Sequence, residues 1–249
     1  MVTPIPRPDF RSADTPMEQL VRLSRYYGSD TEFVIAGGGN SSVKVANRLF
    51  VKASGTDLAT IDAGGFVEMD REALQALLAA DLGTEPSSRE ERFKEAILSA
   101  RVHPEKGQRP SVESVLHNIL PRLFVVHTHA TVANWLACSK DGEQAARELF
   151  GEEVLWIPYV DPGYVLARSV GKVLQAYEAR TGRDCPRALV MQNHGLIVCA
   201  DTPEELCANT DMVVARTRDR VGALPAENWF GPCRRIDAEQ ARPLINRIG

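Results

Sequence analysis

Apolar residues follow two different spacings along this chain. Leu74, Leu77, Leu78 and Leu82 lie three or four residues apart, which places them on one face of a helix. Short apolar runs bounded by Gly, Pro or Asn predict buried strands instead. Helices are predicted over about 15–28, 70–82, 88–101, 110–121, 130–139, 141–150, 163–180 and 202–221.

The strands are predicted where these helical patterns stop. The stretch FVIAGGGNSSVKVANRLFVKASGTD (33–57) predicts three strands separated by a Gly-rich turn and a short turn, with a second Gly turn after them. Further strands are predicted at 123–127 and 154–159. The stretch RALVMQNHGLIVCA (187–200) predicts a hairpin around an Asn-His-Gly turn. Alternating helices and strands, with hairpins among them, indicate an α/β domain whose mixed sheet is covered by helices.

The domain organisation follows from the absence of a break in this pattern. Residues 1–14 are Pro-rich and are predicted to form an extended arm. Neither a linker nor a repeat interrupts the remainder, so 15–249 is predicted to be one domain. A chain of 249 residues buries enough surface to fold without a metal or a disulfide.

Composition narrows the class of protein. The net charge of −4, with no basic stripe, gives no reason to expect a nucleic acid partner. The apolar stretches are too short to cross a membrane, and MVTPIPRPDF lacks the apolar core of a signal peptide. The five cysteines are scattered and form no CxxC pair, which argues against a disulfide framework or a thiolate zinc site. We therefore expect a cytoplasmic protein.

Two histidines end the strand predicted at 123–127. His127 and His129 are two residues apart, so on a strand both side chains project from the same face, close enough to bind one ion. A third ligand must come from elsewhere, and His194, in the predicted hairpin turn, is the leading candidate. An HxH pair by itself is a weak signal, and His194 has the alternative of a turn residue bonded to backbone.

The other two histidines are expected to be structural. His117 lies four residues after Glu113 on the same side of a short helix, a spacing that allows a hydrogen bond or ion pair. His103, beside Pro104 in a charged loop, is expected to be solvated.

Two Gly/Ser turns add a second kind of site. GGGNSS (37–42) and SGT (54–56) expose backbone N–H groups and hydroxyls, which together can hold an anion. The alternative is that the glycines only make tight hairpins. Because the lysine of a P-loop is absent, nucleotide binding is not implied.

The order GGGNSS, SGTD, PSVES, VVHTHA, QNHGLI resembles the class II aldolase/adducin family, from about residue 32 to residue 221. The resemblance implies a single-domain, three-layer α/β/α sandwich with a mixed, largely antiparallel central sheet. It also implies a homo-oligomer, usually a homotetramer with sites between subunits.

The resemblance assigns roles to individual residues. It implies that His127, His129 and His194 bind one Zn²⁺ per subunit, although another divalent transition metal could occupy three imidazoles. It implies that Glu113 is the catalytic acid/base. The residues implied to hold the substrate phosphate are Gly39, Asn40, Ser42, Ser54, Gly55, Thr56 and Ser111.

The implied activity is that of a metal-dependent lyase. Such an aldolase cleaves a C–C bond in a sugar phosphate or related hydroxy-carbonyl compound through a metal-stabilised enediolate. Two alternatives stay open: an epimerase or dehydratase that uses the same metal site, and a non-enzymatic, adducin-like interaction module. Adducin lacks the histidine set, which this chain keeps.

Three departures from the family pattern bear on the substrate. Val112 stands where the family often has a second serine, which removes one possible phosphate donor. No tyrosine follows Tyr177, so the acid that protonates the leaving aldehyde is unassigned. The stretch 83–110 has the character of an insertion relative to the smaller aldolases.

Overall fold

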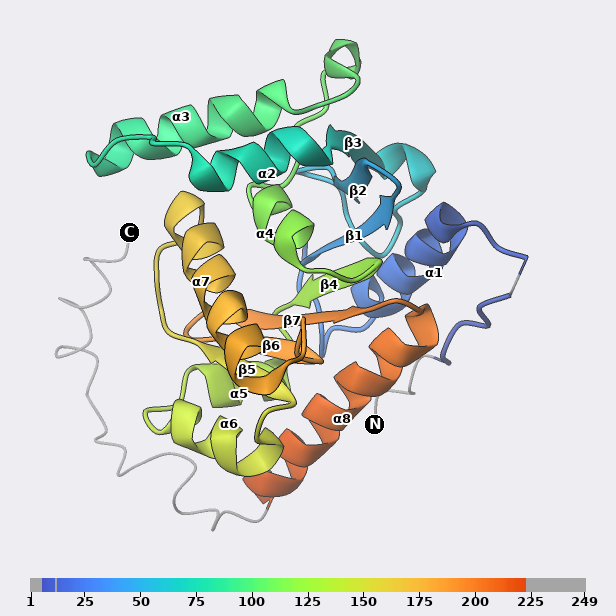
Figure 1. Ribbon diagram of the computed structural model, residues 1–249. Coiled ribbons are helices and arrows are strands. Elements are labelled where there is room, and N and C mark those ends of the chain that lie inside the picture. Colours follow the sequence, from blue (N-terminus) through green and yellow to red (C-terminus); the bar gives the residue numbers. More distant parts are fainter. Residues whose placement is uncertain (1–5, 12, 223–249) are drawn as a thin grey trace, which may run out of the picture. The chain divides into compact units, whose positions relative to one another are not determined.

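A mixed sheet forms the centre of the computed structural model, which describes residues 6–11 and 13–222. Its seven strands lie in the order β3-β2-β1-β4-β7-β6-β5 (Figure 1). β5 and β6 run parallel, and the other five neighbouring pairs are antiparallel. The strands are β1 (Asn40–Val45), β2 (Arg48–Lys52), β3 (Phe66–Asp70), β4 (Phe124–Thr128), β5 (Val154–Ile157), β6 (Ala188–Met191) and β7 (Gly195–Ala200).

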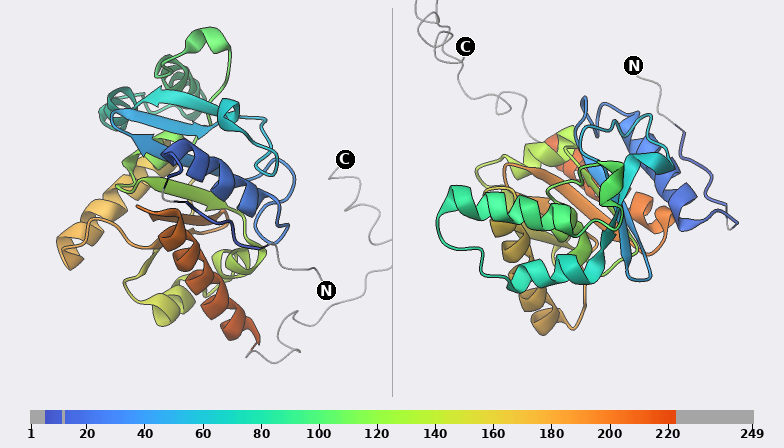
Figure 2. Two further views of the ribbon diagram at one scale, coloured as in Figure 1. Left: turned by 90° about the vertical axis from the view of Figure 1, so that its right-hand side faces the viewer. Right: turned by 90° about the horizontal axis from the view of Figure 1, so that it is seen from above.

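Helices cover both faces of this sheet. Apolar residues of α1 (Pro16–Gly28), α5 (Thr131–Ala137), α6 (Gly142–Phe150) and α8 (Pro203–Gly222) share one buried cluster with one face. Figure 2 shows α1 and α8 together on that side. Residues of α2 (Arg71–Ala79), α3 (Pro86–Ser99), α4 (Ser114–Ile119) and α7 (Tyr164–Thr181) pack on the opposite face. The predicted three-layer α/β/α fold with a largely antiparallel sheet is confirmed.

The chain divides into two compact units, 1–217 and 218–249. The sheet lies in the first, and of the second the structure describes only 218–222, the end of α8. The predicted N-terminal arm lies partly outside the described residues, and 6–11 form neither helix nor strand. A single domain over 15–249 therefore stays a prediction. Within the described part of the chain, every helix is too short or too polar to cross a bilayer.

Local sequence signals account for the helix ends. The Thr15 side chain accepts a hydrogen bond from the Glu18 N–H, and the Glu18 carboxylate accepts one from the Thr15 N–H, which completes the predicted capping box of α1. At the C-terminal end of α7, Gly182 ends the helix with a left-handed φ of 70°.

Two predicted elements differ from the structure, and one strand of the structure was not predicted. Residues 33–36 form no strand, because the Asp30 carbonyl accepts hydrogen bonds from the N–H groups of Phe33 and Val34. The helix predicted over 110–121 is only Ser114–Ile119, because the Ser111 carbonyl accepts from the Ser114 N–H and closes a turn first. The strand β3 was not predicted, although its Val67 and Met69 alternate as buried residues.

Antiparallel pairing brings three turns together at one end of the central strands. Asn40, the first residue of β1, pairs with His127 near the end of β4. Leu196, the second residue of β7, pairs with Thr128, the last residue of β4. The turn before β1, the segment after β4 and the turn before β7 therefore meet, although up to 155 positions separate Gly39 from His194 in the sequence.

A three-histidine site with a buried glutamate

Three imidazoles converge at this end of the central strands. β4 places His127 one residue before its end, His129 follows the strand, and His194 occupies the turn before β7. Their ligand nitrogens all lie within 4.8 Å of one another. The Nε2 atoms of His127 and His129 are 3.1 Å apart. The structure thus brings together the three histidines that the sequence nominates.

The donor set fits a divalent metal ion. With Zn–N bonds of about 2.0–2.1 Å, two ligands of a tetrahedral site lie roughly 3.3 Å apart, close to the separation of the His127 and His129 nitrogens. Burial lowers the pKa of all three histidines, which favours the neutral imidazoles that metals require. His127 is buried whereas His129 is exposed, so the site is open to solvent on one side.

A hydrogen bond to backbone sets the tautomer of His127. Its Nδ1 lies 3.1 Å from the Leu196 carbonyl oxygen, which can only accept, so Nδ1 carries the proton. The lone pair on Nε2 is therefore free and points toward the other two histidines. Such support of a ligand from its far nitrogen is typical of metal-binding imidazoles.

Glu113 lies against this cluster. Its Oε1 is 3.4 Å from Nε2 of His194, and its Oε2 is 3.8 Å from Nε2 of His127. Asn40 Nδ2 donates a hydrogen bond to Oε2, whereas Oε1 is buried without a hydrogen-bond partner. A buried, unpaired carboxylate oxygen is costly, and here it adjoins the ligand atoms of the three histidines.

The pKa of Glu113 reflects opposing effects. Burial raises it, but the imidazoles of His127, His117 and His194, with the hydrogen bond from Asn40, outweigh burial and bring the pKa below its ordinary value. The side chain is therefore a carboxylate at neutral pH, ready to accept a proton.

Gly39 and Asn40 hold this arrangement from β1. Asn40 Nδ2 also lies 3.3 Å from Ser111 Oγ, so one amide links the start of β1 to the segment that carries Glu113. Gly39 has a φ of 69°, and a Cβ there would lie 2.9 Å from the His127 carbonyl oxygen. A side chain at position 39 would therefore strain the backbone and press on β4.

Ser42 and His117 form a buried pair beneath the site. Ser42 Oγ lies 2.7 Å from His117 Nδ1, and both residues are fully buried. Burial lowers the pKa of His117 to about 3, so this imidazole is neutral. The Ser42 hydroxyl is thus engaged away from the surface, and His117 bonds to Ser42 instead of to the Glu113 side chain that its spacing suggested.

The second Gly turn lies beside the segment that precedes Glu113. The Ser54 N–H donates to the Arg109 carbonyl over 2.7 Å, and Ala53 bridges to Pro110. Gly55 has a φ of 84°. A cavity of about 280 Å³ opens here, lined by Ser54, Lys94, Ile97, Leu98, Arg109, Pro110 and Val112.

Sequence reasoning missed two cations of this cavity. Lys94 and Arg109 both belong to the stretch 83–110, which has the character of an insertion. The only available signal was the position of Arg109 one residue before the PSVES stretch.

The comparisons with known proteins agree with this geometry. Residues 18–218 match the family model described as the class II aldolase and adducin N-terminal domain. The chain belongs to this family. A solved N-terminal class II aldolase domain of a conserved protein from Thermoplasma acidophilum is 28% identical, with a TM-score of 0.75 over 86% of this chain and 98% of that one.

Two further comparisons concern the fold of the chain and its length relative to a similar protein. A structure of L-fuculose 1-phosphate aldolase shares the fold with a TM-score of 0.56 at 20% identity, over 96% of this chain and 97% of that one. "Uncharacterized oxidoreductase YuxG" of Bacillus subtilis is 29% identical over 215 residues. Those residues are 82% of this chain but 30% of that protein, so the chain spans less than a third of this relative.

Gly195 is a further residue on which the arrangement of the three histidines depends. A Cβ at this position would lie 2.6 Å from the Thr128 carbonyl oxygen, 2.9 Å from His129 Cδ2 and 3.0 Å from His127 Cε1. Only hydrogen fits between the backbone of β7 and the two imidazoles. The sequence shows this glycine next to His194 but not the rings that it faces.

His127→Ala is expected to lower the affinity for Zn²⁺ by roughly 100-fold or more, because removing even an indirect partner of a ligand typically costs 10–100-fold. Titration of the metal-free protein with a competing chelator measures the change. His103→Ala is the matched control, since its exposed imidazole lies between Glu68 and Glu105. Equal affinities for the two variants would contradict the three-histidine site.

Gly195→Ala is expected to lower Zn²⁺ affinity by about 10-fold or more, because the added methyl group displaces two ligand rings. Gly171→Ala is the control, because no atom lies within 4 Å of a Cβ there and alanine suits α7. The same titration, with circular dichroism to confirm folding, measures both. Unchanged metal affinity in Gly195→Ala would show that the rings tolerate the methyl group.

Proposed function

We propose that this protein is a metal-dependent aldolase that cleaves a C–C bond in a phosphorylated sugar or a related hydroxy-carbonyl compound. The observation that carries the proposal is the position of Glu113. Its buried carboxylate, held by Asn40, lies 3.4 Å and 3.8 Å from the ligand nitrogens of His194 and His127. An acid/base group beside a three-imidazole metal site is the arrangement that reversible aldol chemistry requires.

The metal in this proposal is Zn²⁺, held by His127, His129 and His194. When bound, it supplies a Lewis acid that stabilises negative charge on the carbonyl and hydroxyl oxygens of the substrate. Three neutral imidazoles favour zinc, and a site open at His129 leaves room for substrate oxygens.

Glu113 moves the proton on the carbon beside the substrate carbonyl. Because Asn40 donates to Oε2, the other oxygen, Oε1, remains free to take the proton and to return it. Asn40 also fixes the direction in which the carboxylate faces, which lowers the entropic cost of reaching the transition state.

The anionic end of the substrate binds beside Ser54 and Ser111. The turn formed by Ser54, Gly55 and Thr56 offers hydroxyls and backbone N–H groups, and Ser111 lies between this turn and Glu113. Lys94 and Arg109 line the same cavity and add positive charge. They offset the donor lost at Val112, which is 45% exposed. Gly39 and Asn40 contribute to this site from the start of β1. The Ser42 hydroxyl contacts His117 rather than the substrate.

A homotetramer is the assembly that we propose, with sites near the contacts between subunits. Ile35 and Tyr159 support it, because these large side chains are 73% and 52% exposed next to the end of the central strands that carries the histidines. The Tyr159 N–H donates to Gln192, two residues before His194. The cytoplasmic location rests on the sequence alone.

Glu113→Gln is expected to lower kcat for cleavage by about 10²–10⁴-fold, because it removes the group that transfers the proton, while the bound Zn²⁺ is retained. A screen of zinc-loaded protein against ketose 1-phosphates, with dihydroxyacetone phosphate as the measured product, tests this. Glu105→Gln, an exposed glutamate that contacts His103, is the control and should cleave like the wild type.

Other outcomes of the screen distinguish the alternatives. Loss of water or an isomerised sugar would replace the aldolase by a dehydratase or an epimerase at the same site. Full metal occupancy without turnover of any substrate would favour an adducin-like interaction module.

Arg109→Gln is expected to raise KM for a phosphorylated substrate by about 10-fold with little change in kcat, since it removes one charged contact to the anion. Arg147→Gln is the control, because Arg147 pairs with Glu143 on the surface of α6. Steady-state kinetics with a phosphorylated sugar and its unphosphorylated counterpart measure the effect. An equal rise in KM for both substrates would argue against an anion contact at Arg109.

A further inference from the structure

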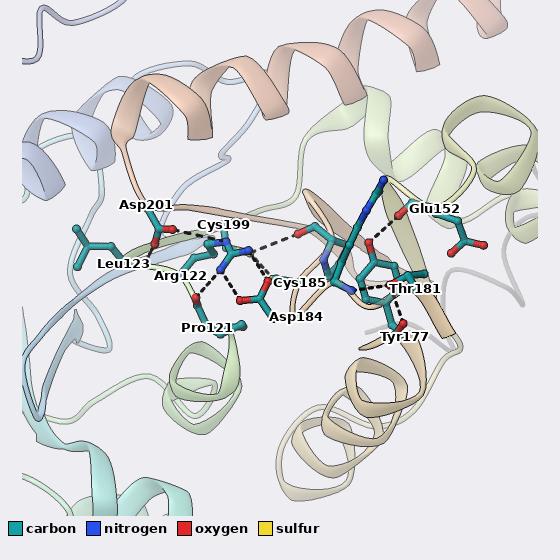
Figure 3. Close-up of polar contacts among 12 residues, drawn as sticks. Pro121, Arg122, Leu123, Glu152, Tyr177, Thr181, Asp184, Cys185, Cys199 and Asp201 are labelled. Atoms are coloured by element: carbon teal, nitrogen blue, oxygen red, sulfur yellow. Dashed lines mark hydrogen bonds and ion pairs between the residues drawn. The ribbon is translucent and has the colours of Figure 1, made fainter. Parts of the chain in front are cut away.

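Two cysteines lie close together at the end of β7 that is opposite to the histidines. Cys199 is the last residue but one of β7, the strand that begins beside His194, and Cys185 lies three residues before β6. Their Sγ atoms are 3.3 Å apart (Figure 3). The aldolase chemistry proposed above uses neither residue, and the scattered cysteine positions gave no sign of a pair.

The backbone already holds these sulfurs near bonding distance. β6 and β7 are antiparallel neighbours with Ala188 opposite Val198, so Cys199 lies beside the segment that leads into β6, and Cys185 lies in that segment. A disulfide needs an S–S distance of about 2.0 Å, so the two sulfurs must move closer together for the bond to form.

An ion pair anchors the loop that carries Cys185. Arg122 donates two hydrogen bonds to the Asp184 carboxylate, at 2.6 Å and 2.8 Å, and its Nε lies 3.8 Å from Asp201. Figure 3 shows Arg122 between these two aspartates. Lys44 Nζ donates to the Arg122 carbonyl over 2.8 Å. The loop is thus tied to the start of β4, and two cations lie near the thiols.

Both thiols are buried, and Cys185 is 8% exposed. Cys185 lines a cavity of about 490 Å³ together with Glu153, Tyr177, Arg183 and Arg187, whereas Cys199 lies behind it, 2% exposed. The hydrogen bond with Cys185, together with burial, raises the pKa of Cys199 well above its ordinary value. The cavity therefore gives a small oxidant access to Cys185, beside Arg183 and Arg187.

We propose that Cys185 and Cys199 are a dithiol modification site that hydrogen peroxide converts into an intramolecular disulfide. The Cys185 thiolate attacks one peroxide oxygen, the O–O bond breaks, and the departing hydroxide takes a proton to become water. The Cys199 sulfur then attacks the Cys185 sulfenic acid, the S–O bond breaks, and a second water leaves with the Cys199 proton. Two thiols lose two hydrogen atoms, and one peroxide becomes two waters.

The test is peptide mapping of the full zinc-loaded chain after treatment with hydrogen peroxide. Remaining thiols are alkylated under denaturing conditions, and mass spectrometry identifies the joined peptides. The proposal predicts one cross-link between Cys185 and Cys199, lighter by two hydrogens than the sum of the free peptides and reversed by dithiothreitol. Alkylation of both residues at a dose that oxidises the exposed Cys138 would overturn it, as would Cys185 joined to any other cysteine.

A pair of variants separates the two steps. In Cys199→Ser, Cys185 is expected to stop at the sulfenic acid and to be labelled by dimedone, whereas Cys138→Ser should form the cross-link as the wild type does. Absence of dimedone labelling at Cys185 in folded Cys199→Ser would show that Cys185 is not the residue that peroxide oxidises. If Cys199→Ser fails to fold, the wild-type map decides the question alone.

Discussion

The antiparallel pairing of β4 with β1 on one side and β7 on the other is the constraint on which the site depends. It places His127 opposite Asn40, and it brings the Leu196 carbonyl within 3.1 Å of His127 Nδ1. The first contact aligns the amide that holds Glu113, and the second frees the imidazole nitrogen that faces His129. A shift of one residue in either pairing would turn His127 to the other face of the sheet and separate these groups.

The same pairing explains why two positions beside the histidines have no room for a side chain. Gly39 and Gly195 lie where the backbones of β1 and β7 pass the histidines, and a methyl group at either position would come within 3.0 Å of a neighbouring atom. Because both strands continue away from this end, β7 also carries Cys199 to the far end, beside Cys185. β7 thus begins beside the three histidines and ends beside the two cysteines.

Local signals predicted the fold and the three histidines that converge. The HxH spacing of His127 and His129, and the turn that holds His194, needed only strand periodicity and a resemblance in the order of motifs. The strand predicted at 33–36 was wrong, because backbone bonds to Asp30 close turns that hydrophobic periodicity does not report. The role of Gly195 and the meeting of Cys185 with Cys199 depend on the register between strands, and Lys94 joins Ser54 only through the packing of α3. Spacing along one chain carries no information on such contacts.

The central claim is that His127, His129 and His194 bind one divalent metal beside Glu113. X-ray absorption spectroscopy at the zinc edge of the loaded protein tests it most directly. The account predicts a shell of nitrogen and oxygen ligands at about 2.0–2.1 Å, with the multiple-scattering signature of three imidazoles and no sulfur. A sulfur shell at about 2.3 Å, or fewer than two imidazoles, would contradict the account.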